Sequence, residues 1–195
     1  MKKYYIIAVL VGLLIAMFAF KSEPTSSGVK DKNYTDEVIK KAAYTRTLTK
    51  KEIYQLMYRP ITASIEKYKS EYKCSPLELR RAITAMIILE TGHLKAQSVA
   101  INSLTGIKKI KNRPSFRMPT TEYYLGIKVY EDHEFSAFFS FEDAIDNLFI
   151  LWRKDIYKEL READNLEEFI EALDDSPYAT DPNHGNKLFK ILEGF

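Results

Sequence analysis

The chain has 195 residues, which suits one domain with extra length at one end. Apolar residues make up 46% and charged residues 29%, which excludes a disordered or collagen-like chain. Residues 1–32 hold five of the 29 basic and two of the 27 acidic residues, so the remaining 163 residues carry 24 basic and 25 acidic groups. This nearly neutral body gives no support for electrostatic binding of nucleic acid.

The amino terminus predicts export. Met1-Lys2-Lys3 precedes seventeen uncharged residues, Tyr4 to Phe20, and Lys21 follows. Residues 1–20 are therefore expected to be a signal anchor or a signal peptide. No small-x-small cleavage pattern precedes Phe20, which favours an uncleaved anchor through residues 4–20. Lys2 and Lys3 would then lie on the cytoplasmic side of the membrane. In both cases the body reaches the periplasm or cell wall.

Residues 21–33 are small and polar and contain Pro24 and Gly28, which predicts a flexible tether. Residues 34–195 are expected to form the domain. A capping box at Thr49 to Glu52 predicts a helix through Tyr68, kinked by Pro60. A second capping box, Ser75 to Glu78, opens a helix that ends at Thr91-Gly92 and is apolar nearly all round, so it should form the buried centre.

Residues 92–118 lack a helical period and are predicted to be loops. Residues 121–132 alternate around Gly126, which predicts a short β-hairpin. Capping residues then predict three further helices, over 140–152, 165–173 and 181–192. The expected fold class is mainly α with a small β-hairpin lobe (α+β).

Glu90 is the first candidate catalytic residue. It follows Met86-Ile87-Ile88-Leu89 at the carboxyl end of the apolar helix, where burial and the negative helix end both favour the protonated acid. A carboxylic acid kept protonated is what a glycosidase needs to protonate a departing sugar oxygen. The alternative is a helix-end side chain that reaches solvent.

A glycosidase also needs a second carboxylate. Glu122, at the start of the predicted hairpin, is one candidate, and Glu131, Asp132 and Glu134 at its far end are the others.

Five segments follow one another along the chain, around Glu90, Asn102, Thr120, Phe135 and Tyr178. Together they resemble the glucosaminidase family of peptidoglycan hydrolases, the family-73 glycoside hydrolases. Glu90-Thr91-Gly92-His93 and Asn102-Ser103-Leu104-Thr105-Gly106-Ile107-Lys108 are similar to its first signature, and Thr120 to Tyr123 to its hairpin element. Phe135 to Ile145 and Tyr178-Ala179-Thr180-Asp181-Pro182-Asn183, with Lys187-Leu188, are similar to its last two. The resemblance covers about residues 50–193.

The resemblance implies a lysozyme-like fold and an endo-β-N-acetylglucosaminidase that cuts the β-1,4 bond after N-acetylglucosamine in peptidoglycan glycan strands. Glu90 matches the general acid and Glu122 the second acid, which activates a water or orients the substrate's 2-acetamido group. Tyr178 matches an aromatic residue of the cleft. Substrate contacts are also expected at Tyr123, Asn102, Gly106 and His93. The chain departs from the family pattern at His93 and at Thr105. It also departs at His184-Gly185, which replaces the usual Tyr-x of the last motif.

A metal site is not expected, because the only cysteine is Cys74 and the three histidines are far apart. No organic cofactor is expected, and the protein should be a monomer. Three alternatives remain: a lytic transglycosylase, a muramidase of the same fold, or a weakly active module that binds or assembles the wall.

Overall fold

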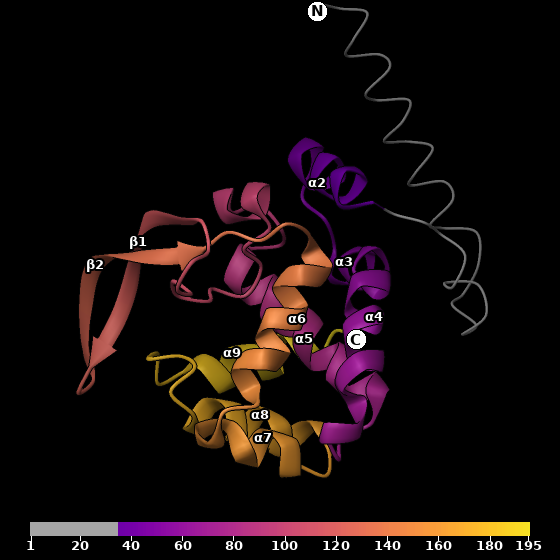
Figure 1. Ribbon diagram of the computed structural model, residues 1–195, viewed down its shortest axis with the longest axis vertical. Helices are drawn as coiled ribbons and strands as arrows, with labels where there is room; N and C mark the ends of the chain where they lie inside the picture. Colours follow the sequence, from indigo (N-terminus) through magenta and orange to yellow (C-terminus); the bar gives the residue numbers. More distant parts are fainter. Residues whose placement is uncertain (1–34) are drawn as a thin grey trace, which may run out of the picture.

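The computed structural model describes residues 35–195 of the chain. The predicted anchor and tether lie outside the described residues. Within residues 35–195, no helix is long and apolar enough to cross a membrane. The described part is a helical body from which one two-stranded antiparallel hairpin projects (Figure 1). The predicted fold class, mainly helical with a small β-lobe, is confirmed.

The helices follow one another along the chain with short 3-10 turns between some of them. They are α2 (Asp36–Thr45), α3 (Lys50–Leu56), α4 (Tyr58–Tyr68), α5 (Pro76–Thr91), α6 (Phe141–Trp152), α7 (Lys158–Glu162), α8 (Leu166–Asp175) and α9 (His184–Leu192). The hairpin strands are β1 (Ser115–Tyr124) and β2 (Ile127–Ser136). Helix α2 and the five-residue helix α7 were not predicted from the sequence.

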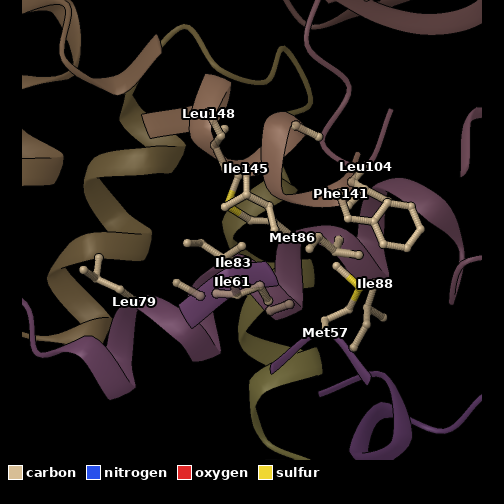
Figure 2. Close-up of a cluster of buried hydrophobic side chains, with 14 of the residues drawn as sticks. Met57, Ile61, Leu79, Ile83, Met86, Ile88, Leu104, Phe141, Ile145 and Leu148 are labelled. Atoms are coloured by element: carbon tan, nitrogen blue, oxygen red, sulfur yellow. The ribbon is translucent and has the colours of Figure 1, made fainter. Parts of the chain in front are cut away.

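Helix α5 is the centre of the body, as predicted. Its capping box is formed, since the Ser75 hydroxyl accepts from the Glu78 backbone and the Glu78 carboxylate accepts from the Ser75 N–H. Gly92 ends the helix in the left-handed conformation, at φ +54°. The helix packs against α3, α4, α8 and α9. Figure 2 shows its buried side chains, among them Ile83 and Met86, meeting those of neighbouring helices.

The predicted kink at Pro60 is a break between two helices. Helix α3 ends at Leu56 and α4 begins at Tyr58, with Met57 between them. Proline has no N–H to donate to the carbonyl four residues earlier, and its ring clashes with that carbonyl. For Pro60 that carbonyl belongs to Leu56, so the preceding helix has to end there.

The hairpin is longer than predicted, because β1 starts at Ser115 inside the expected loop. Strand β1 contains Pro119, which is tolerated because each strand of a two-stranded sheet has an open edge. The turn consists of Leu125 and Gly126, both with positive φ, and Tyr124 pairs with Ile127 across it.

Helix α9 begins at His184, not at Asp181 as predicted. The Asp181 carboxylate accepts a hydrogen bond from the Asn183 backbone N–H at 3.0 Å. Such a local side-chain bond offers the backbone an alternative to helix, so residues 181–183 form a turn that precedes α9.

Candidate active site

A cleft of about 840 Å³ lies between the helical body and the hairpin. Both candidate carboxylates line it, Glu90 from the last turn of α5 and Glu122 from β1. Residues 106–111, residues 177–181 and one side of α6, with Asn147, Ile150 and Leu151, also line it. The fold therefore brings together two acids that are separated by the predicted loop region.

Glu90 is less buried than the sequence predicted. Its side chain is 28% exposed, because this side of the last turn of α5 lines the cleft. Gly106 lies directly against it: a Cβ on Gly106 would approach Glu90 Oε2 to 3.0 Å. Gly106 also has φ +62°, so both the close approach and the backbone conformation favour glycine there.

Glu122 is the buried acid of the pair, with a side chain that is 8% exposed. Lys108 Nζ lies 2.9 Å from Oε1, and the Thr180 hydroxyl donates to Oε2 at 2.7 Å. Burial alone would raise the pKa of Glu122, but the hydrogen bonds from Thr180 and Lys108, together with the charges of Lys108 and His133, lower that pKa overall. Glu122 is thus held as a carboxylate at neutral pH.

The other hairpin acids do not line the cleft. Glu131 pairs with His133, at 2.8 Å, and accepts a hydrogen bond from Tyr124. Glu134 pairs with Lys109 at 2.9 Å. Among the candidates for the second acid, Glu122 alone therefore faces Glu90 across the cleft.

Two of the predicted substrate-binding residues line the cleft, namely Gly106 and Tyr178. The Tyr178 hydroxyl donates to the Thr105 carbonyl at 2.6 Å. Burial, together with the nearby charge of Glu90, raises the pKa of Tyr178 well above its usual value, so the hydroxyl remains a donor. This bond fixes the 177–181 segment to the loop that carries Gly106.

The other three predicted substrate-binding residues do not line the cleft. His93 Nδ1 lies 2.9 Å from the Leu48 carbonyl oxygen, and the Asn102 amide donates to the Phe138 carbonyl at 2.8 Å. Tyr123 neighbours Glu122 on β1, and successive strand side chains point to opposite faces.

Three residues of the site were not found as functional residues in the sequence, namely Lys108, Thr180 and His184. Lys108 and Thr180 lie within segments that carry the family resemblance, and this resemblance was the signal that could have identified them. His184 stood out only as a departure from the family pattern. Its Nε2 lies 3.5 Å from Glu90 Oε1.

Thr180→Val should destabilise the protein in a pH-dependent way. Because the pKa of Glu122 is lowered in the folded state, its carboxylate stabilises the fold above about pH 4.3, its unfolded value, and that stability is lost as the pH falls through the folded pKa. Removing one charged hydrogen bond should cost about 1–2 kcal/mol at pH 7 and less at pH 3.

Urea unfolding at both pH values checks this expectation, with Thr180→Ser as a control that keeps the hydroxyl. An equal loss at pH 7 and pH 3 would show that Thr180 does not act through the Glu122 charge.

The family model of the glucosaminidases, described as mannosyl-glycoprotein endo-beta-N-acetylglucosaminidase, matches residues 63–195. The chain belongs to this family. The resemblance carried by the sequence motifs is thereby confirmed. A curated relative in the comparison is the exo-glucosaminidase LytG of Bacillus subtilis (strain 168), 31% identical over 118 residues. The alignment covers 57% of this chain and 42% of LytG, so the chain spans less than half of that relative's length.

Solved structures share the fold. A peptidoglycan hydrolase mutant from Sphingomonas sp. A1 aligns with a TM-score of 0.58 and 24% identity, covering 71% of this chain and 92% of that one. The catalytic domain of the autolysin Auto from Listeria monocytogenes aligns with a TM-score of 0.58 and 18% identity, covering 88% and 96%. The C-terminally truncated glycoside hydrolase domain of FlgJ from Salmonella typhimurium aligns with a TM-score of 0.55 and 23% identity, covering 75% of this chain and 97% of that one.

Proposed function

We propose that this protein is a glycoside hydrolase that cleaves the β-1,4 bond on the reducing side of N-acetylglucosamine in peptidoglycan. The observation that carries the proposal is the pair of carboxylates in one cleft, each in a different environment. Glu122 is buried and held ionised, whereas Glu90 is partly exposed at the end of α5. Two carboxyl groups in contrasting environments are the pattern that glycosidases use.

In the proposed mechanism Glu90 donates a proton to the glycosidic oxygen as the bond breaks. Glu122 stays negative and stabilises the positive charge that develops at the anomeric carbon. In one route, Glu122 activates a water molecule. In the other, Glu122 accepts a hydrogen bond from the N–H of the substrate's 2-acetamido group, whose oxygen then attacks the anomeric carbon. Both routes need the carboxylate form, which the contacts with Lys108 and Thr180 favour.

The shape of the cleft supports a polymeric substrate. Phe116, Met118, Thr120 and Glu122 alternate along β1 and all line the cleft. A wall from Phe116 to Glu122 is about 20 Å long, since a strand rises about 3.3 Å per residue. Phe116 lies against Phe135 of β2, with ring centroids 6.0 Å apart, which gives this wall an apolar portion on which sugar faces can pack.

We place this activity outside the cytoplasm, with residues 4–20 as a membrane anchor and residues 34–195 as an independent domain. The full-length protein should sediment with membranes, and a fragment of residues 34–195 should stay in the supernatant. The fragment should unfold in one transition and retain activity, because residues 1–33 are not needed for the core. A mature amino terminus between residues 20 and 28 would contradict the anchor.

The proposed activity is tested by incubating residues 34–195 with purified insoluble peptidoglycan. We expect reducing ends to appear and mean glycan length to fall early, as for an endo-acting enzyme. Retention on the wall without release of reducing ends would instead indicate a binding module. Release of short fragments only, with long strands surviving, would indicate exo action.

A further inference from the structure

His184 is a buried imidazole beside the candidate acid. It is the first residue of α9, it is 4% exposed, and it lines the cleft. Its Nε2 lies 3.5 Å from Glu90 Oε1, which is longer than the roughly 2.7–3.2 Å of a hydrogen bond. A small movement of the partly exposed Glu90 side chain would close this distance.

Both ring nitrogens of His184 lack a hydrogen-bond partner within residues 35–195. Buried polar atoms in folded proteins are usually hydrogen-bonded, so an imidazole with two unpartnered nitrogens requires an explanation. At least one of the two nitrogens always carries a proton. A proton on Nε2 has the Glu90 carboxylate as its nearest charged acceptor.

The 177–181 segment does not supply another partner for the imidazole. The ring of Tyr178 lies 5.9 Å from that of His184, centroid to centroid, but its hydroxyl donates to the Thr105 carbonyl. Burial raises the pKa of Asp181, but its hydrogen bonds with Lys187 and the Asn183 backbone N–H, together with the charges of Lys187 and His184, lower that pKa overall. The Asp181 carboxylate is thus bonded to Lys187 and to the Asn183 backbone.

The neighbouring helices do not supply a partner either. On α8, Asp174 accepts from the Gly185 backbone N–H at 2.8 Å. On α9 itself, Lys187 is one turn further along and pairs with Asp181. Among these charged neighbours, Glu90 of α5 alone lies within 4 Å of a His184 ring nitrogen.

We propose that His184 is a positioning residue that holds Glu90 through Nε2 and competes with it for the acid proton. This inference rests on the proposed role of Glu90 as general acid. The transfer is a reversible shift of one proton from Glu90 Oε1 to His184 Nε2, which converts acid and imidazole into carboxylate and imidazolium. A donor or a positive charge at this place favours the carboxylate, so activity is confined to lower pH than in a chain without the imidazole.

Two variants separate the parts of this role. His184→Phe keeps a buried ring and removes both nitrogens. His184→Gln keeps a donor but cannot become an imidazolium. The alkaline limb of kcat/KM on peptidoglycan fragments should move to higher pH by about one unit in His184→Phe and by less in His184→Gln. Asp174→Asn is the matched control, since it removes a charge near α9 but keeps the acceptor for Gly185, and its limb should not move.

The deciding measurement uses NMR of the histidine ring nitrogens and needs no activity. Coupling between two sites is reciprocal, so in Glu90→Gln the His184 ring should titrate about one pH unit lower than in the wild type. The His184→Phe spectrum assigns the signal among the three histidines.

An unchanged His184 titration in Glu90→Gln would overturn the inference. An alkaline limb of the kcat/KM profile that stays in place or moves to lower pH in His184→Phe would also overturn it. A protein that shows the coupling but does not cleave peptidoglycan would leave the contact standing and overturn the proposed function instead.

Discussion

Glu90→Gln should reduce turnover of peptidoglycan by at least about a hundredfold, the low end of what general acid catalysis supplies. The amide keeps the size of the side chain and its reach into the cleft but has no acidic proton to give to the glycosidic oxygen. Binding to intact glycan should persist, because the cleft keeps its shape. Initial rates of reducing-end release measure the effect.

The free energy of unfolding of Glu90→Gln should hold or rise, because a helix-end carboxylate near the negative end of the dipole is replaced by a neutral amide. Glu162→Gln is the matched control. Glu162 is also the last residue of a helix, α7, but its partner is Lys158 and it does not line the cleft. A Glu90→Gln protein that digests peptidoglycan at near the wild-type rate would remove Glu90 as the acid.

Glu122→Gln should also cost about a hundredfold in turnover, for a different reason. The amide can still accept the Thr180 hydrogen bond, but it cannot carry the negative charge that Lys108 and Thr180 maintain. The thermal midpoint should stay within a few degrees, because Lys108 is 53% exposed and remains solvated when its partner becomes neutral. Activity and thermal unfolding are measured on the same preparation.

Glu134→Gln is the control for Glu122→Gln on the same hairpin. Glu134 pairs with Lys109 and does not line the cleft, so its loss of charge should leave turnover nearly unchanged. A large loss in Glu134→Gln with a small one in Glu122→Gln would show that the second acid lies at the other end of the hairpin.

Local signals explain which parts of the fold could be predicted from sequence. The start and end of α5 depend on Ser75, Glu78 and Gly92, which act within one helical turn, and both were predicted correctly. The hairpin turn at Gly126 is similarly local. The length of β1 depends on pairing between Ser115 and Ser136, which lie on the two arms of the hairpin, so no local signal sets it.

The candidate site was predictable only where a motif carried it. Glu90 and Glu122 were predicted, but the burial of Glu90 depends on how the other elements pack around the end of α5, which the sequence does not indicate. The Thr180 contact with Glu122 joins residues 58 positions apart, and no local pattern reports it. His184 approaches Glu90 for the same reason, through the packing of α9 on α5.

The central claim is tested most directly by identifying the sugar at the new reducing ends. Peptidoglycan digested by residues 34–195 is reduced with borohydride, and the reduced fragments are separated and identified by mass, with Glu90→Gln as the blank. The proposed reaction predicts that the reduced sugar is N-acetylglucosaminitol and that it is missing from the blank. Reduced muramic acid would identify a muramidase, and a 1,6-anhydro end, lighter by one water, would identify a lytic transglycosylase; either result would contradict the account.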